Sequence, residues 1–274
     1  MFSILEKMEL ATKIKLLRVS APAIAKKAKA GQFVILRVDE KGERFPLTLA
    51  DWDKEEGTIT LVFLEVGVST TKLGDLEVGD EIHDLTGPLG NPSKIKRFGT
   101  VAVVCGGVGT AATFPIARAL KAAGNRIVTI IGARTADLLI LEDEMRRYSD
   151  ELYISTDDGS KGHKGFVSDV LKELIEKGEH FDLAYAIGPP LMMRATVNVA
   201  KAFSLKTIVS LNPIMVDGCG MCGACRVKVG EKTKFACLDG PEFEGNIVDF
   251  DELLKRLRIY RSKEEQALKH LMTP

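Results

Sequence analysis

The chain has 274 residues, of which 45% are apolar, and its 38 basic and 38 acidic side chains leave no formal net charge. This balance gives no strong attraction to nucleic acid, and the apolar content excludes a mainly disordered chain, so about two folded domains are expected. The N-terminus lacks a basic stretch followed by an apolar block, and glycines and a proline interrupt the uncharged residues 98–117, which predicts a cytoplasmic protein with no membrane span.

Residues 1–97 have the pattern of a small β-barrel. They contain short runs rich in β-branched residues, each bounded by Gly, Pro, Asp or Lys. The clearest of these runs are residues 13–19, 32–38, 58–66 and 79–85. We therefore expect a first domain made almost entirely of strands.

The pattern changes after residue 97. From 98 to 212, apolar strands alternate with helical segments, which predicts a doubly wound parallel sheet. Residues 213–274 then form a loop rich in Cys and Gly, followed by a charged tail that we expect to be helical. The predicted fold class is a β-barrel domain, an α/β domain and a small C-terminal module.

The turn after the first strand of the α/β region is rich in glycine and reads Gly106-Gly107-Val108-Gly109-Thr110. Gly107, Gly109 and Ala112 have the spacing of a dinucleotide fingerprint, in which a pyrophosphate approaches the backbone at the start of a helix. A merely structural turn is the alternative, but a strand before it and a helix after it favour a nucleotide. An acidic residue for the ribose is missing after the second strand, where Arg134 would either favour a 2′-phosphate or simply be solvated.

Four of the five cysteines lie between residues 219 and 237. Cys222, Cys225 and Cys237 fit the plant-type spacing of a [2Fe–2S] site, whose first position falls on Asp217, while Cys219 is out of register. Neighbouring glycines would let the loop wrap tightly. A structural zinc site is the alternative, but the second closely spaced cysteine pair that is usual for zinc is absent from the sequence.

Together these motifs resemble the ferredoxin–NADP reductase superfamily. Within it, the chain is most similar to the electron-transfer subunits related to that of dihydroorotate dehydrogenase, in particular the small subunits of electron-bifurcating NADH-dependent ferredoxin:NADP oxidoreductases. The resemblance covers essentially the whole chain and depends on residues 44–51, 87–90, 105–110, 156–159, 164–166, 188–190 and 211–217. It implies an FAD-binding barrel at 1–97, an NAD(P)-binding domain at 98–212 and a [2Fe–2S] module at 213–274.

The resemblance also implies which barrel residues hold FAD. The superfamily motif R-x-Y-[ST] lines the flavin, and its last three places are Pro46, Leu47 and Thr48 here. Thr48 would place a hydroxyl near the flavin N5 and is the one side chain expected near the reacting atoms. The chain departs from the motif in two places. Leu47 replaces the stacking tyrosine, and Phe45 stands where the motif has the arginine that binds the FAD pyrophosphate, with Arg44 one place earlier.

Further cofactor contacts follow from the same resemblance. A turn with Gly67, Ser69 and Thr70 would hold the FAD phosphates, after a lining strand with Val62, Phe63 and Leu64. The nicotinamide contacts would come from the loop at 106–110 and from Arg134, Asp157, Asp158, Gly188 and Pro189. For the cluster, the resembling small subunits have an Asp in the first ligand position, which favours Asp217 over Cys219 as the partner of Cys222, Cys225 and Cys237.

The implied function is a subunit that moves electrons between NAD(H), FAD and one [2Fe–2S] cluster, with NADP(H) possible. A nicotinamide gives two electrons as hydride and the cluster takes one at a time, so a flavin must mediate. The expected partner is a larger, glutamate-synthase-like flavoprotein subunit with iron–sulfur clusters, which exchanges electrons with ferredoxin.

Three alternatives stay open. One is the electron-transfer subunit of a dihydroorotate dehydrogenase, where a Cys would be expected in place of Asp217. A second is a zinc-stabilised nucleotide-binding regulatory module without enzyme activity. The third is a free-standing ferredoxin–NADP reductase, which does not need a cluster of its own.

Overall fold

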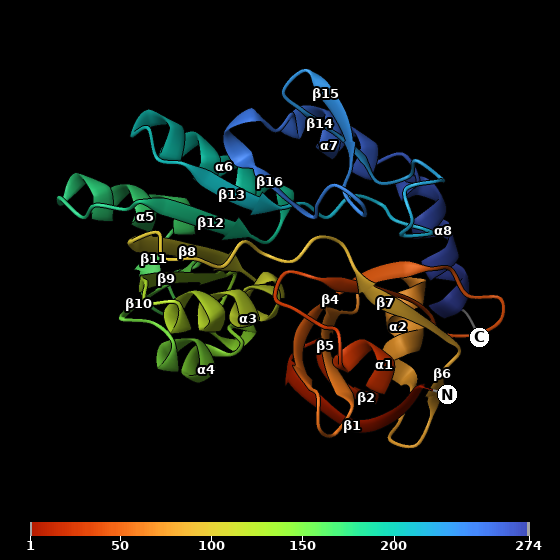
Figure 1. The fold of residues 1–274 in the computed structure, drawn as a ribbon. Helices are drawn as coiled ribbons and strands as arrows, with labels where there is room; N and C mark the ends of the chain where they lie inside the picture. The colour runs from red at the N-terminus through yellow and green to blue at the C-terminus, as the bar shows by residue number, and fades with distance from the viewer. Residues whose placement is uncertain (1, 273–274) are drawn as a thin grey trace.

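The computed structural model describes residues 2–272. Its first part is a barrel-like antiparallel sheet with the strand order β6-β1-β2-β5-β4-β3-β7 (Figure 1). The strands and helices of this part are β1 (Phe2–Ala11), β2 (Ile14–Ser20), α1 (Pro22–Ala25), β3 (Phe33–Arg37), β4 (Phe45–Asp53), β5 (Thr58–Leu64), α2 (Val68–Asp75), β6 (Glu81–Ile82) and β7 (Asp84–Leu89). The predicted barrel is confirmed, although the sequence patterns did not predict β1 or α2.

The second part is a mixed sheet with the order β11-β10-β9-β8-β12-β13-β16, whose strands run parallel except for β16. Its elements up to residue 210 are β8 (Thr100–Gly106), α3 (Gly109–Ala122), β9 (Arg126–Ala133), η1 (Ala136–Leu138), α4 (Glu142–Arg147), β10 (Glu151–Thr156), β11 (His163–Lys164), α5 (Val167–Glu176), β12 (Leu183–Ile187), α6 (Pro190–Ala202) and β13 (Thr207–Ser210). Helices α3 and α4 cover one face and α5 and α6 the other (Figure 1). The predicted doubly wound sheet is therefore confirmed.

The C-terminal part begins with an irregular loop and lies against both sheets. It contains β14 (Arg226–Val229), β15 (Lys232–Phe235), β16 (Glu242–Glu244), η2 (Gly245–Ile247), α7 (Phe250–Leu257) and α8 (Arg261–Met272). Strand β16 pairs antiparallel with β13 and so extends the α/β sheet, a pairing that the sequence did not predict. The tail is helical as expected, and α8 lies beside α2 of the barrel (Figure 1).

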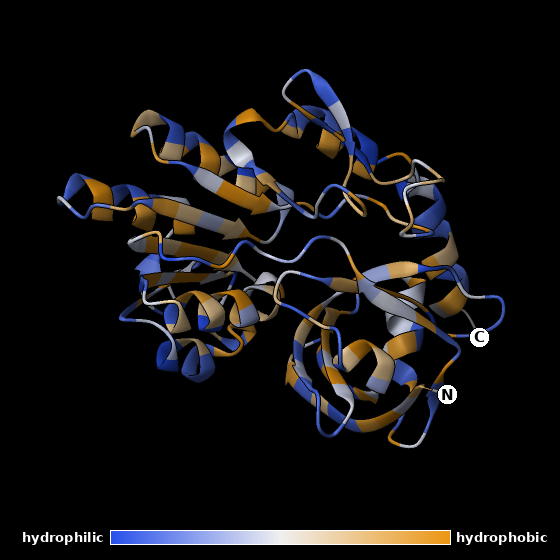
Figure 2. Ribbon diagram, in the orientation of Figure 1, coloured by the Kyte–Doolittle hydropathy of each residue, from blue (hydrophilic) through white to orange (hydrophobic). Residues whose placement is uncertain are grey.

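The central strand of the α/β sheet is apolar on both faces because helices cover both sides. Along β8, Ala102 and Val104 belong to the core shared with α5 and α6, while Val101 and Val103 belong to the core under α3. Figure 2 shows the same concentration of apolar residues along β8 and β12. Among residues 2–272, no helix has both the length and the apolar character needed to cross a bilayer.

A buried carboxyl group lies where the linker between the two sheets meets β16. Ser93 Oγ donates a hydrogen bond to Glu242 Oε1 at 2.5 Å, and the nearby Tyr185 hydroxyl is buried without a hydrogen-bond partner among the described residues. Burial raises the pKa of Glu242 from its ordinary value of 4.5 to about 7. The junction therefore favours the protonated form of this group.

We expect Glu242→Gln to stabilise the protein at neutral pH. Between pH 4.5 and about 7 the unfolded chain releases the Glu242 proton while the folded chain keeps it, so the native protein loses stability as pH rises through this window. The glutamine variant lacks this loss and should gain roughly 3 kcal/mol relative to the parent between pH 4.5 and pH 8. Urea unfolding at both pH values measures the gain, and an equal difference at both would contradict it.

Candidate functional site

The glycine-rich loop lies at the carboxyl edge of the parallel sheet, where the strand order reverses. The chain goes from β8 to β9 on one side and later returns to β12 on the other, so the loop after β8 faces the crevice where open α/β sheets bind ligands. Gly107 has φ +55° and a position for a Cβ that meets nothing within 4 Å. This backbone is therefore open to a ligand, as the predicted pyrophosphate site requires.

The glycines around this loop allow close approach of strand ends. A Cβ on Gly109 would lie 2.4 Å from the Ile187 carbonyl oxygen at the end of β12, and one on Gly188 would lie 3.2 Å from the Gly106 carbonyl oxygen. The Thr110 hydroxyl is buried and lies within hydrogen-bonding reach of the Cys105 thiol. The start of α3 is thus held against β12, and the N–H groups of Gly107, Thr110 and Ala111 donate to the carbonyls of Gly132, Gly107 and Val108.

The loops after β9 and β10 bring Arg134 and two acidic residues together. The Asp157 N–H donates to the Ala133 carbonyl at 3.1 Å, and the Asp158 N–H donates to the Arg134 carbonyl at 3.2 Å. All three predicted side chains are exposed. Hydrogen bonds from Ser160 lower the pKa of Asp158, so this carboxyl stays ionised at neutral pH. The carboxylates of Asp157 and Asp158 therefore belong to the same pair of loops as Arg134, the residue considered for binding a 2′-phosphate.

The predicted flavin strand has two different faces. Leu47 packs against the barrel core, so its side chain is not free to stack on a flavin as an exposed aromatic ring would be. Thr48 pairs with Phe33 of β3 and Pro46 pairs with Ile35. Phe33 and Ile35 belong to the core that the α/β sheet shares with the C-terminal part, so Thr48 lies on the barrel face that is turned toward that core.

The strand expected to line the flavin is also divided between two environments. The Phe63 side chain is 1% exposed within the barrel core, so this residue could line a cofactor only through its backbone. Val62 instead packs in a cluster with Ala111 of α3, and Leu64 lies against the same cluster. The barrel strand and the start of the nucleotide helix therefore contribute to the same apolar cluster.

Residues 67–70 form a helix start where a turn was expected. Gly67 precedes α2, and Thr70 Oγ1 accepts hydrogen bonds from the N–H groups of Val66 and Gly67 at 3.0 and 3.1 Å. The Thr70 hydroxyl also donates to the Gly67 carbonyl, so it is fully used in capping. The Thr70 hydroxyl thus caps the helix start at which the phosphate was predicted to bind, next to Ser69.

The cysteine loop brings two of its sulfur atoms together. Cys225 Sγ and Cys237 Sγ lie 3.2 Å apart, and both residues are buried. Burial, and then the adjoining Cys225 thiol, raise the pKa of Cys237 to about 12. The Cys237 N–H lies 3.5 Å from Cys225 Sγ, and the Gly220 backbone hydrogen-bonds to Cys237. Two thiolates this close need a bound cation to balance their charge.

The other two predicted ligands lie on the same loop but do not close around this pair. Cys222 is exposed, and Asp217 is half-buried with its Oδ1 3.7 Å from Arg44 Nη1. Cys219 is exposed as well. Among residues 2–272, no three His, Cys, Asp or Glu side chains converge as a preformed site for a single metal ion. The Arg44 side chain, expected at a pyrophosphate, instead lies beside acidic groups.

These residues fit an iron–sulfur cluster. Gly218, Gly220 and Gly223 all have positive φ, between +67° and +81°, so the loop turns sharply between the predicted ligands. A Cβ on Gly218 would lie 2.7 Å from Leu89 Cδ1 and 2.8 Å from Ile35 Cδ1, so the loop packs tightly on the barrel. Backbone donors directed at buried sulfurs are typical of such sites.

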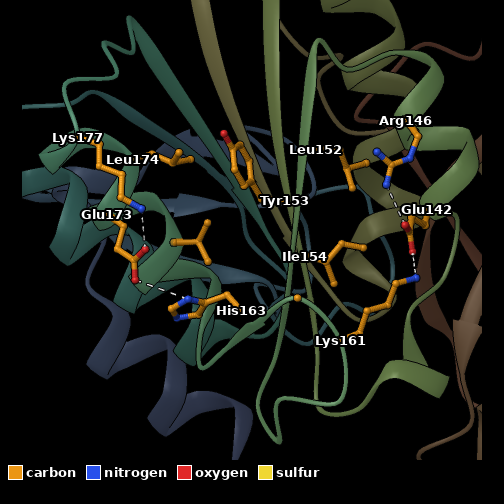
Figure 3. A pocket seen from close by; sticks show the side chains of 12 residues that line it. Glu142, Arg146, Leu152, Tyr153, Ile154, Lys161, His163, Glu173, Leu174 and Lys177 are labelled. Atoms are coloured by element: carbon orange, nitrogen blue, oxygen red, sulfur yellow. Dashed lines mark hydrogen bonds and ion pairs between the residues drawn. The ribbon is translucent and has the colours of Figure 1, made fainter.

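A cavity of about 410 Å³ lies beside β10 and is lined by residues of β10, α4, α5 and the loop before β11 (Figure 3). Its charged groups are already paired, with Lys161 Nζ 2.6 Å from Glu142 Oε2 and Lys177 Nζ 3.3 Å from Glu173 Oε2. Figure 3 shows these pairs on opposite sides of the strand. None of the cofactor or cluster residues predicted from the sequence lines this cavity.

Two family models match the chain. Residues 103–198 match an oxidoreductase NAD-binding domain, and residues 212–249 match the iron–sulfur cluster binding domain of dihydroorotate dehydrogenase B. The second match favours the iron–sulfur interpretation of the cysteine loop over the zinc interpretation.

Several relatives are similar over nearly the whole chain. A dihydroorotate dehydrogenase B electron transfer subunit homolog of Thermotoga maritima is 51% identical over 96% of this chain and 92% of its own length. The dihydroorotate dehydrogenase B electron transfer subunit of Clostridium perfringens is 33% identical over 82% of this chain and 88% of its own length.

A solved structure is also similar. It is that of an NADH-dependent reduced ferredoxin-NADP oxidoreductase, analysed for flavin-based electron bifurcation. It is 48% identical, covers 100% of this chain and 98% of its own, and has a TM-score of 0.95. The chain therefore belongs to the family of electron-transfer subunits that includes those of dihydroorotate dehydrogenase B.

Proposed function

We propose that this chain is an oxidoreductase subunit that takes hydride from NADH onto FAD and passes single electrons through a [2Fe–2S] cluster to a larger subunit. The observation that carries the proposal is the arrangement of the three predicted sites. Val62 of the flavin strand packs with Ala111 of the nucleotide helix, and the loop of the predicted cluster ligands packs on Ile35 of β3. Strand β4 with Thr48 pairs with that same β3 strand.

The residues of the chain have mainly binding and orienting roles in this reaction. The backbone at 106–110 would hold the nicotinamide pyrophosphate, and the start of α2 would hold that of FAD. Thr48 would donate or accept a hydrogen bond at the flavin N5. FAD, when bound, accepts hydride and releases electrons singly. Asp217, Cys222, Cys225 and Cys237 would hold the cluster, and no acid or base is needed for hydride transfer.

We expect the purified protein to prefer NADH over NADPH by tenfold or more in kcat/KM with an artificial electron acceptor. Asp157 and Asp158 lie in the loop beside Arg134, and their charges would repel a 2′-phosphate more than one exposed arginine attracts it. A preference for NADPH would reverse the assignment.

The visible absorption spectrum of the purified protein should show flavin and iron–sulfur bands. A colourless protein with bound zinc would overturn the proposed function.

Replacing Thr48 with Val should leave FAD bound but slow its reduction by NADH about tenfold, which corresponds to about 1.4 kcal/mol. Valine keeps the shape of threonine and removes only the hydroxyl. Stopped-flow absorbance of the flavin measures the rate, and Ser69→Ala is a control that removes a hydroxyl elsewhere in the predicted flavin site. An unchanged rate in Thr48→Val would show that Thr48 has no role at N5.

The partner we propose is a larger flavoprotein subunit of the glutamate-synthase type, which carries iron–sulfur clusters and exchanges electrons with ferredoxin. The similarity to the ferredoxin-NADP oxidoreductase structure over the full chain supports this partner. A dihydroorotate dehydrogenase catalytic chain is the second candidate, because relatives are electron transfer subunits of that enzyme. Co-purification from the native organism separates the two.

A further inference from the structure

A row of alternating charges leads from the barrel to the cysteine loop. Arg37 of β3 and Asp84 of β7 are cross-strand partners, and both Arg37 Nε and Nη2 bond Asp84 Oδ2, at 2.8 and 2.6 Å. Arg44 Nη2 lies 3.9 Å from the same Asp84 oxygen, and Arg44 Nη1 lies 3.7 Å from Asp217 Oδ1. Arg44 is therefore held between an acid on the barrel and an acid on the loop.

The charge of Arg44 is directed mainly at Asp217. Two nitrogen atoms of Arg37 already bond the Asp84 carboxylate at close range, so Arg37 compensates most of the charge of Asp84. Asp217 has no other cation within 4 Å among the described residues. Both Arg44 and Asp217 are partly shielded from water, with side chains 47% and 36% exposed. Their attraction is therefore weakened by solvent but not abolished.

We propose that Arg44 is a positioning residue for the iron–sulfur site, which holds Asp217 in place and raises the reduction potential of the cluster. The inference depends on the proposed function, because it takes Asp217 as a cluster ligand. It also gives Arg44 a different role from the FAD pyrophosphate contact that the superfamily motif implies.

The physical basis is the charge change on reduction. One electron is added and no bond is made or broken, so the site becomes more negative by one unit. A guanidinium beside a ligand carboxylate stabilises the reduced form more than the oxidised form. Arg44 also directly precedes β4, the strand with Thr48, so the same short segment contacts the predicted flavin site and the cluster site.

The test uses Arg44→Gln in the purified holoprotein, with redox titration of the cluster followed by electron paramagnetic resonance and with FAD content measured separately. We expect the midpoint potential to become more negative, the [2Fe–2S] spectrum to change shape, and the FAD content to stay that of the parent. Arg44→Lys keeps the charge and should restore most of the potential. Arg18→Gln removes an equal charge that pairs with Glu6 and Glu56 on the barrel, so its potential should match the parent.

Three other outcomes would overturn either the role proposed for Arg44 or the proposed function. An unchanged cluster potential in Arg44→Gln, with FAD lost, would overturn the inference and return Arg44 to the flavin pyrophosphate. An equal shift in Arg18→Gln would also overturn it, because the effect would then come from net charge alone. A parent protein without any [2Fe–2S] signal would overturn the proposed function itself, and the inference with it.

Discussion

Replacing Cys237 or Cys225 with Ser is expected to abolish the [2Fe–2S] signal, whereas replacing Cys219 with Ser should leave a spectrum like that of the parent. Cys225 and Cys237 are the two sulfurs that the fold itself brings together, 3.2 Å apart in a buried position. Serine has nearly the same size but is a harder and far less acidic ligand, so it binds iron much more weakly than a thiolate does. Iron content and electron paramagnetic resonance after chemical reduction measure the loss.

The same experiment decides the fourth ligand. Asp217→Cys should keep a cluster with a shifted spectrum, because carboxylate and thiolate carry equal charge but differ in softness. Loss of the [2Fe–2S] signal in Cys219→Ser, together with an unchanged signal in Asp217→Ala, would show that Cys219 is the fourth ligand. Far-ultraviolet circular dichroism of each variant separates loss of the cluster from loss of the fold.

The α/β sheet could be predicted from the sequence because its signal is local. A strand such as β8 that is covered on both faces reads as an uninterrupted apolar run, and the glycine-rich turn follows it directly. The cysteine spacing is equally local, since three predicted ligands lie within sixteen residues, from 222 to 237. Features that depend on neighbours in sequence are the ones that sequence patterns predict.

What could not be predicted depends on contacts between distant parts of the chain. Strand β16 has only three residues, and its pairing with β13 brings Glu242 next to Ser93, which lies 149 positions earlier. Helix α2 is an exception, because it was expected as a turn on account of its weak apolar pattern, although the hydrogen bonds to Thr70 that stabilise its start are local. The ion pair between Arg44 and Asp217 joins residues from the barrel and the loop that no spacing relates.

Gly109→Ala is expected to destabilise the protein by about 3 kcal/mol and to weaken nucleotide binding, whereas Gly107→Ala should cost only about 1 kcal/mol. A Cβ at Gly109 would lie 2.4 Å from the Ile187 carbonyl oxygen and 2.8 Å from Gly188 Cα. Both are backbone atoms of a buried strand end, so the start of α3 must move away from β12. A Cβ at Gly107 meets nothing within 4 Å, and its cost comes from the positive φ alone.

The two variants therefore separate folding from binding. Gly107→Ala places a methyl group where the predicted pyrophosphate approaches, so its affinity for NADH should fall more than its stability does. In Gly109→Ala the loss of affinity should follow the loss of stability, because the loop itself is displaced. Urea unfolding and equilibrium NADH binding measure both quantities. If Gly109→Ala were as stable as the parent, the tight contact between α3 and β12 would not be needed for the fold, and the loop would have to be positioned by other contacts.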